Sequence, residues 1–417
     1  MNPELAKVTA LSVHLRGRRI GVINRLAGDR YIFAFEQDYV DDPNRPTLSL
    51  SYKGQSGGLV TAVRAVGRRL PPFFANLLPE GHLRDYLAEK AGVKPEREFY
   101  LMAVLGGDVA GAVTIQPMDA GGRDGAHAHH DDDLLAEDQV KKGVLRFSLA
   151  GVQLKFSAVT EASGGLTIPA NGTGGSWIVK LPSMRFPAVA ENEYAMLELA
   201  RSVGIEVPAI KLVRVADIQG LPLDAARMEG YALAVERFDR AARGSRIHME
   251  DFAQVFGLFP DDKYGSRSYA NIATVLWAET GDTGAYEFVR RLVFSVLIGN
   301  GDMHLKNWSL LYPDGRTPVL SPAYDFVATL PYIRGDSLAL TFGGSRSLDG
   351  ITLDQVRRFT EKARMPMDPV WRIVRETVER TEAAWKALPQ KDLLPSDMRK
   401  AVDEQILAAA SKTGRKS

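Results

Sequence analysis

The 417-residue chain contains no cysteine, so it has no disulfide framework, no thiolate metal site and no cysteine nucleophile. A long hydrophobic run is absent too. The longest apolar stretch near the best helix candidates, residues 292–298, is interrupted by Ser295 and is far too short to span a bilayer. The first residues, Met1 to Glu4, carry charge early and lead into no apolar core of a secretory signal. We therefore expect a soluble, cytoplasmic protein that makes no contact with a membrane.

The chain also lacks an excess of one charge, because 52 Lys and Arg against 51 Asp and Glu leave a formal net charge of +1. This balance argues against electrostatic binding of nucleic acid by the whole chain, although a local basic patch is compatible with it. With 45% hydrophobic and 25% charged residues, the composition is that of an ordinary globular protein. The length predicts two or three domains, or one large domain with an accessory module.

The first part of the chain, residues 1–118, is predicted to form short strands and turns with two helical stretches. Alternating apolar residues at 8–15 and 20–25 flank a Gly-Arg-Arg turn, which is the pattern of a hairpin. Residues 119–141 are polar, with His and Asp clustered at 127–133, and we interpret them as a flexible linker. His and Asp also bind metals, but in a polar linker a solvated charge run is the favoured interpretation.

The remaining chain divides into a strand-rich segment, residues 142–242, and a mainly helical segment, residues 243–417. In the first, apolar residues at helical spacing predict a helix over 192–203. Strands are expected at 177–181, 210–215 and 231–238. In the second, Asp368 and Pro369 have the character of an N-cap and a first helical residue, with an apolar face behind them.

The sharpest chemical signal is the loop Gly299-Asn-Gly-Asp-Met-His-Leu-Lys-Asn307, which follows an apolar helix-like stretch. A short strand, a Pro-Asp-Gly-Arg turn and a second acidic residue, Asp325, come next. This order is typical of the catalytic loop and metal site of kinases. Asp302 is placed to orient an acceptor hydroxyl and take its proton, and Asn307 and Asp325 supply the hard oxygen ligands that Mg²⁺ prefers. In a purely structural interpretation Asp302 is a turn residue, Asn307 a strand-entry cap and Asp325 a helix N-cap.

A lysine at the end of a strand fits the same chemistry. Lys180 follows Trp-Ile-Val, as the ATP-binding lysine follows the strand of a Val-Ala-Ile-Lys motif. Such a lysine reaches the α- and β-phosphates when a carboxylate of the next helix orients it. Glu191 and Glu193 open that helix, and we select Glu193 for the ion pair. The alternative is that both acids only complement the helix dipole.

The segment from Phe147 to Ser157 lies where a loop covering the phosphates is expected. It contains one glycine and matches neither the kinase glycine-rich motif nor the Walker A motif. From spacing alone it is an unremarkable hairpin.

Taken together, these motifs resemble the HipA family of bacterial toxin–antitoxin serine/threonine kinases, and the resemblance runs almost from end to end. The motifs that carry it occur in the expected order at 73–81, 106–113, 148–155, 178–182, 191–193, 235–240, 299–307 and 323–325. The resemblance implies an α+β, protein-kinase-like bilobal fold. It also implies an added N-terminal β-rich subdomain (1–118), a kinase N-lobe (142–242) and a mostly helical C-terminal lobe (243–417).

The resemblance further implies site residues that spacing does not identify. Glu236 and Phe238 would lie in the hinge whose backbone pairs with adenine, and Lys180 would be the ATP lysine. The segment from Ser148 to Lys155 looks like the family's phosphate-binding loop. It implies nucleotide contacts from Ala150, Gly151, Val152, Gln153 and Lys155. In that family the serine at the Ser148 position is autophosphorylated, which places about −1.5 to −2 charge beside the ATP phosphates and repels the nucleotide.

His304 follows the expected base by two residues, where many protein kinases place a lysine. We weigh two roles for it: a cationic or hydrogen-bonding role towards the γ-phosphate, and a hydrogen bond from its ring to a backbone group that holds the loop.

The resemblance also implies partners. Such toxins pair with a small helix-turn-helix antitoxin of the HipB type, and the complex, rather than the toxin alone, binds operator DNA. Their best-known protein substrates are aminoacyl-tRNA synthetases. ATP and Mg²⁺ are the implied cofactors.

Two other functions remain open on sequence grounds. The Gly-Asp-x-His-x-x-Asn pattern at 301–307 also looks like the loop of aminoglycoside and choline phosphotransferases, although those chains lack the motifs at 73–81 and 148–155. A pseudokinase serving only as corepressor is the non-enzymatic alternative. The intact set Lys180, Asp302, Asn307 and Asp325 argues against it.

Overall fold

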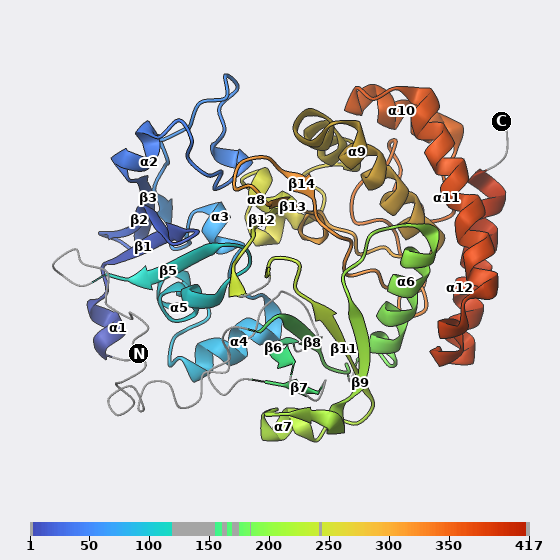
Figure 1. Cartoon of the computed structure of the whole chain (residues 1–417), viewed down its shortest axis with the longest axis horizontal. Coiled ribbons are helices and arrows are strands. Elements are labelled where there is room, and N and C mark those ends of the chain that lie inside the picture. Colours follow the sequence, from blue (N-terminus) through green and yellow to red (C-terminus); the bar gives the residue numbers. More distant parts are fainter. Residues whose placement is uncertain are drawn as a thin grey trace.

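The computed structural model describes residues 3–118, 155–160, 165–168, 175–183, 185–241 and 244–413. The expected linker (119–141) and Ser148, Ala150, Gly151, Val152 and Gln153 lie outside the described residues. In Figure 1 the first sheet and helices α10 to α12 lie at opposite ends of the molecule, with the second sheet and α6 between them.

The first sheet has five strands in the order β4-β3-β2-β1-β5, all antiparallel. The strands are β1 (Ala10–Leu15), β2 (Arg18–Leu26), β3 (Arg30–Phe35), β4 (Val66–Gly67) and β5 (Val113–Pro117). The predicted hairpin is confirmed as β1 and β2, which Gly17 joins with a φ of 81°, a value that glycine adopts without strain. The helices beside this sheet are α1 (Pro3–Lys7), α2 (Gln37–Asp41), α3 (Pro72–Ala75), α4 (Gly81–Lys90) and α5 (Glu98–Leu105).

The second sheet has six strands in the order β10-β7-β6-β8-β11-β9. They are β6 (Lys155–Thr160), β7 (Leu166–Thr167), β8 (Trp177–Lys180), β9 (Ile210–Arg214), β10 (Ile218–Gln219) and β11 (Tyr231–Glu236). The three strands predicted in this segment are confirmed as β8, β9 and β11. The predicted helix is confirmed as α6 (Val189–Val203), which ends at Gly204 in the left-handed conformation that favours glycine. A short helix, α7 (Leu223–Ala226), follows β10.

The last part of the chain is mainly helical, with a small sheet of β12 (His248–Asp251), β13 (Ser309–Tyr312) and β14 (Val319–Leu320). Its helices are α8 (Phe252–Val255), α9 (Tyr269–Leu297), α10 (Leu353–Ala363), α11 (Met367–Ala387) and α12 (Ser396–Thr413). No described helix is both long enough and apolar enough to cross a membrane.

The start predicted for helix α11 is wrong by two residues. The helix begins at Met367, and Pro366 rather than Asp368 occupies the N-cap position. Pro369 is therefore the third helical residue. It is tolerated there because the first four N–H groups of a helix have no partner within the helix. Met367 packs against the apolar core, which extends the helix beyond the start that its capping residues predicted.

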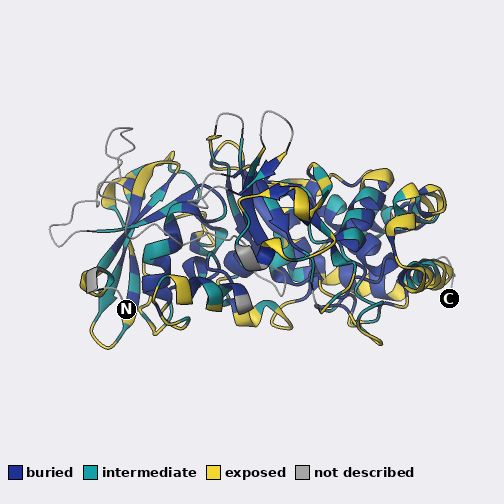
Figure 2. Cartoon of the chain, turned by 90° about the horizontal axis from the view of Figure 1, so that it is seen from below, coloured by how far each residue is buried: buried dark blue, intermediate teal, exposed yellow. Residues whose placement is uncertain are grey.

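Two clusters of buried apolar side chains hold the molecule together, and Figure 2 shows buried positions running through its interior. One cluster joins α6 to the helical part of the chain. The other joins both large sheets, because Leu11 and Phe33 of the first sheet belong to it together with Val179 and Ala234 of the second. The first two sheets are therefore not separate globules with a core each.

Candidate active site

A cavity of about 630 Å³ opens between the second sheet, the loop after α9 and residues of the N-terminal part, residues 3–118. It is large enough for a nucleotide-sized ligand. The predicted site residues that line it are Lys155, Lys180, Glu193, Glu236, Phe238, Asp302, His304, Asn307 and Asp325. The structure thus brings together every predicted site residue that it describes.

In the loop after α9, two asparagine side chains hydrogen-bond to the main chain of Asp302 and fix it. The Asp302 N–H donates to Asn300 Oδ1 at 3.0 Å, and Asn307 Nδ2 donates to the Asp302 carbonyl oxygen at 2.8 Å. Gly299, with a φ of 69°, lets the chain turn sharply out of the helix. The main chain on both sides of the expected base is therefore held in place.

The side chain of Asp302 is exposed at the mouth of the cavity, and Tyr264 Oη donates a hydrogen bond to its Oδ1 at 2.7 Å. The carboxyl is nevertheless partly buried by the groups around it, which raises the pKa of Asp302 above its usual value, and the hydrogen bond from Tyr264 opposes this rise.

Asn307 and Asp325 face the same cavity with oxygen atoms suited to a hard cation. The amide nitrogen of Asn307 is committed to the Asp302 carbonyl, so its oxygen is the atom presented to a ligand. Asp325 adopts a φ of 56°, a left-handed conformation unusual for a residue other than glycine. It lies in an irregular segment with no helix directly behind it, so the interpretation of Asp325 as a helix N-cap is wrong.

Lys180 lies at the end of β8, and its Nζ contacts the carboxylates of both Glu193 and Asp325. The ion pair predicted between Lys180 and Glu193 is therefore present. Burial by itself would lower the pKa of Lys180, but the charges of Asp325 and Glu193 outweigh it and raise that pKa. For Asp325 burial acts in the opposite sense, and the charges of Lys155 and Lys180 hold its pKa well below the usual range. Asp325 is thus an anion at neutral pH.

Lys155 is a second buried lysine in the same place. It pairs with Lys180 across the β6–β8 ladder, and its Nζ lies 3.9 Å from Asp325 Oδ1. Burial lowers the pKa of Lys155. The two ammonium groups give this wall of the cavity the charge that phosphate oxygens require.

The predicted hinge begins at Glu236, the last residue of β11. The side chain of Glu236 is exposed, and its N–H donates to the Ala209 carbonyl at 2.8 Å, which leaves the Glu236 carbonyl for the backbone contact that the prediction requires. The Phe238 ring packs against Tyr324 with 5.6 Å between centroids.

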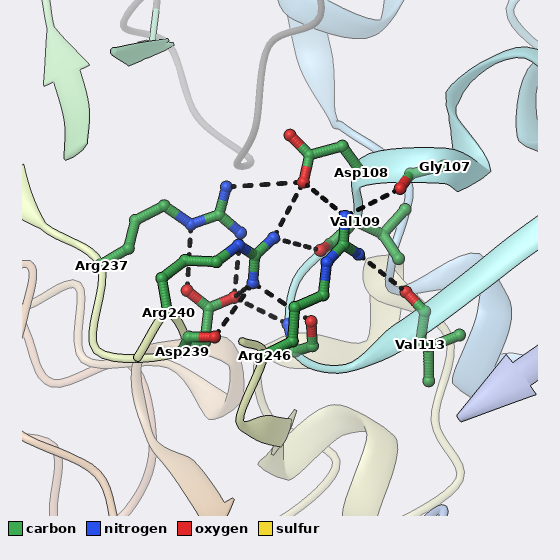
Figure 3. A network of polar contacts seen from close by, with 9 residues as sticks. Gly107, Asp108, Val109, Val113, Arg237, Asp239, Arg240 and Arg246 are labelled. Carbon is green, nitrogen blue, oxygen red and sulfur yellow. Dashed lines mark hydrogen bonds and ion pairs between the residues drawn. The ribbon is translucent and has the colours of Figure 1, made fainter. Parts of the chain in front are cut away.

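A buried ionic network anchors this hinge to the N-terminal part, as Figure 3 shows. Asp239 accepts from Arg237 Nε at 3.0 Å, from Arg240 Nη1 at 2.6 Å and from the Gly111 N–H at 2.8 Å. Asp108 accepts from Arg240 Nη2 at 2.9 Å and from Arg246 Nη2 at 3.2 Å. Burial would raise the pKa of Asp239, but the charges of Arg237 and Arg240 and the hydrogen bonds from Arg237 and the Gly111 N–H together outweigh it and lower that pKa.

His304 is buried, and its Nδ1 has no hydrogen-bond partner among the described residues. Burial lowers the pKa of His304 to about 3, so the ring is neutral at physiological pH. The cationic role considered for this side chain is therefore not supported. A ring-to-backbone hydrogen bond that would hold the loop is not present among the described residues either. The role as a neutral hydrogen-bonding group towards the γ-phosphate stays a prediction.

The sequence interpretation missed Tyr264 and the part played by Glu80. The Glu80 carboxylate lies 2.7 Å from Lys306 Nζ and 2.6 Å from Lys263 Nζ. Glu80 belongs to the motif at 73–81, and Lys306 to the loop that carries Asp302. Lys306 lies in the loop of the expected base, and the sequence predicts no catalytic role for it. This was the sequence signal that could have indicated a structural partner for Lys306.

Comparison with known proteins agrees with this geometry. The family model of the HipA-like C-terminal domain matches residues 147–385, and the family model of the HipA N-terminal domain matches residues 11–116. A Sinorhizobium fredii protein named "Putative kinase Y4dM" is 51% identical over 394 residues, 94% of this chain and 94% of that protein. The serine/threonine-protein kinase toxin HipA of Shewanella oneidensis is 26% identical over 362 residues, 78% of this chain and 77% of the toxin.

Among solved structures, the complex of Shewanella oneidensis HipA, HipB and operator DNA contains a chain with a similar fold. The TM-score is 0.71 at 22% identity, and the match covers 97% of this chain and 96% of the other. The expected α+β, kinase-like architecture is confirmed. The chain belongs to the HipA family of protein kinases.

Proposed function

We propose that this chain transfers the γ-phosphate of ATP to a serine or threonine hydroxyl of a protein, as the toxin of a type II toxin–antitoxin module. The observation that carries the proposal is the meeting, in one cavity, of the Lys180–Glu193 ion pair with Asp302, Asn307 and Asp325. These are the parts that protein kinases use for phosphoryl transfer.

Each residue has a role that its environment supports. Asp302 orients the acceptor hydroxyl and takes its proton. Lys180, held by Glu193, binds the α- and β-phosphates, and Lys155 adds a second positive charge beside them. The backbone of Glu236 and Phe238 binds adenine. The contacts of Ala150, Gly151, Val152 and Gln153 with the phosphates are proposed from the family resemblance alone, because these residues lie outside the described part of the chain.

The residues present fit a magnesium ion. Asp325 is ionised, and the oxygen of Asn307 is free of the contact that its nitrogen makes, so the pair offers one anionic and one neutral oxygen ligand. When bound, Mg²⁺ neutralises charge on the phosphate oxygens.

The proposed regulation and partners rest on the family. We infer autophosphorylation at Ser148, which would add negative charge next to the phosphates and switch the enzyme off. The partner is a helix-turn-helix antitoxin of the HipB type, and operator DNA is bound through that complex. The near-neutral charge of +1 agrees with DNA contacts made chiefly by the antitoxin. The substrate is a cytoplasmic protein such as an aminoacyl-tRNA synthetase.

Incubation of the purified protein with Mg²⁺ and radiolabelled ATP tests the chemistry. We expect label on Ser148 in the wild type and none in Asp302→Asn, which removes the charge of the base with almost no change in shape. The control is Asp349→Asn, which alters an exposed carboxylate whose ion pair is with Lys412, and it is expected to label normally. Equal labelling of the Asp302 variant would overturn the assignment of the base.

Expression in cells tests the toxin role separately. Growth should stop when the wild type is expressed without its antitoxin and continue when Asp302→Asn is expressed. Normal growth with a catalytically active protein would exclude the toxin role and leave the kinase activity standing. Comparing phosphorylated proteins between the two cultures identifies the substrate.

A further inference from the structure

Tyr264 contacts the carboxylate of the expected base directly. Its hydroxyl donates to Asp302 Oδ1 at 2.7 Å, and its ring packs edge to face on His304 with 5.0 Å between centroids. The side chain is not part of the apolar core, since Tyr264 is 48% exposed. A large aromatic residue is therefore kept at the surface, with its hydroxyl aimed at the reacting carboxylate.

The backbone around Tyr264 is shaped to hold it there. A 3₁₀ turn, Pro260–Lys263, leads into it, and Gly265 follows with a φ of 77°. Ser266 closes the segment, because its N–H donates to the Tyr264 carbonyl at 3.0 Å and its hydroxyl to the Asp262 carbonyl at 2.7 Å. A side chain at Gly265 would be strained at this φ and would approach Arg346 Nη2 to 3.3 Å.

A single carboxylate of the N-terminal part holds both this segment and the catalytic loop. Glu80 Oε2 lies 2.6 Å from Lys263 Nζ, next to Tyr264, and Glu80 Oε1 lies 2.7 Å from Lys306 Nζ, next to Asn307. Lys306 also donates to the Asn76 carbonyl at 3.1 Å. Glu80 and both lysines are less than one fifth exposed, so water competes little with these contacts.

We propose that Tyr264 is a positioning residue for Asp302, and that Glu80 holds Tyr264 in register with the catalytic loop. The main chain of Asp302 is already fixed at its N–H and its carbonyl, which leaves the rotation of the carboxylate as the remaining freedom. The bond from Tyr264 to Oδ1 removes that freedom and leaves Oδ2 for the acceptor hydroxyl. This inference rests on the proposed kinase activity.

The competing idea is that Tyr264 blocks the acceptor site. The two ideas predict opposite effects of removing the hydroxyl. A blocking residue would release activity when it is lost, and would lower the KM for the protein substrate. A positioning residue would reduce kcat, because misplacement of a catalytic group by about 1 Å costs on the order of 10²-fold in rate.

Steady-state kinetics of Tyr264→Phe decides between them. The phenylalanine keeps the ring against His304 and lacks the hydroxyl. We expect kcat to fall about tenfold or more, with the KM for ATP unchanged because, among the described residues, the hydroxyl bonds to Asp302 and to neither Lys155 nor Lys180. Glu80→Gln should also lower kcat, because Glu80 is proposed to hold Tyr264 in place. The control is Tyr286→Phe, which alters a tyrosine that packs on Trp277 away from the cavity, and it should keep full activity.

The outcomes are distinct. An unchanged or raised kcat in Tyr264→Phe would overturn the positioning role while leaving the kinase assignment intact. A fall in kcat accompanied by an equal rise in the KM for ATP would overturn it as well, because general damage to the site would then explain the loss. Absence of transfer by the wild type would overturn the proposed function and this inference together. If Tyr264→Phe does not fold, Glu80→Gln gives the same kcat-against-KM comparison.

Discussion

The ammonium group of Lys180 contacts the carboxylates of both Glu193 and Asp325 in a site from which most water is excluded. Replacing it with methionine keeps the length of the side chain and removes the charge. We expect Lys180→Met to lower kcat/KM by on the order of 10² to 10³, since the preorganised charge proposed to hold the α- and β-phosphates is lost. The measurement is ATP-dependent phosphorylation at matched concentrations of folded protein.

The matched control for this change is Lys53→Met. Lys53 also pairs with a glutamate, because its Nζ lies 2.7 Å from Glu279, but that pair is at the surface and outside the cavity. Lys53→Met should leave kcat/KM unchanged and should change the free energy of unfolding by no more than about 1 kcal/mol. Equal losses in both variants would show that the effect of Lys180 is not specific to the site.

His248 gives the protein a pH dependence of stability. Its Nε2–H donates to the Leu48 carbonyl at 2.8 Å, and its Nδ1 is buried without a hydrogen-bond partner among the described residues. Burial lowers the pKa of His248 from its usual 6.5 to about 4. Between these values the unfolded chain binds a proton that the folded protein does not. The free energy of unfolding is therefore complete above about pH 6.5 and decreases as the pH falls towards 4.

The variant His248→Gln isolates this contribution. Glutamine keeps a donor for the Leu48 carbonyl and does not titrate. Urea unfolding at a series of pH values should show the wild type losing on the order of 3 kcal/mol more than the variant between pH 6.5 and 4. His304 titrates in both proteins and cancels in the difference. Parallel pH profiles would contradict the prediction.

At the scale of elements, the segment after β11 depends on a buried set of charges shared between two parts of the chain (Figure 3). Asp239→Asn would leave Arg237 and Arg240 without their closest negative charge. Breaking a buried ion pair from one side costs about 3–5 kcal/mol. We expect a loss of this order in the free energy of unfolding, together with a weaker affinity for ATP because the hinge is adjacent.

The comparison for this variant is Asp354→Asn. Asp354 lies 3.0 Å from Arg358, and both side chains are 55% exposed. Its replacement should change the free energy of unfolding by less than about 1 kcal/mol. Chemical denaturation of the two variants side by side checks the difference, and similar small losses in both would show that the buried network contributes little.

The elements of this fold were largely predictable because each has a local signal. The hairpin of β1 and β2, the strands β8, β9 and β11, and helix α6 all follow from periodicity and turn residues close in sequence. The start of α11 was predicted two residues late, because capping residues were weighed without the apolar contact that Met367 makes. Local pattern gives the element, and packing decides where it begins.

The candidate site was predictable to the extent that its residues lie in ordered motifs. Lys180 with Glu193, and Asp302 with Asn307 and Asp325, were selected from sequence and all face one cavity. Tyr264 and Glu80 were not selected, because the contacts that give them meaning join residues 38 and 183 positions apart. Contacts between residues so far apart in the sequence have no local pattern, and the neutral state of His304 likewise depends on burial that no motif reports.

At the scale of the whole molecule, the N-terminal part and the second sheet share one apolar cluster. Deleting residues 1–141 would expose the Val179 and Ala234 side of that cluster and remove Glu80 and Asp108 from their partners. We expect the fragment 142–417 to be insoluble or unfolded, because apolar burial is the main favourable contribution to folding. Circular dichroism and size-exclusion chromatography of the fragment check this. A folded fragment that binds ATP would contradict it.

The left-handed backbone of Asp325 has a consequence for how inactive forms of this protein should be prepared. Asparagine, like aspartate, tolerates a φ of 56°, whereas alanine at this angle is strained by roughly 1–2 kcal/mol. An alanine variant would therefore combine the loss of the proposed oxygen ligand with a shifted main chain. Asp325→Asn keeps the shape of the side chain, removes its negative charge and replaces one carboxylate oxygen with an amide NH2 group. It is the better trap for capturing the protein with its nucleotide and its still unidentified substrate bound.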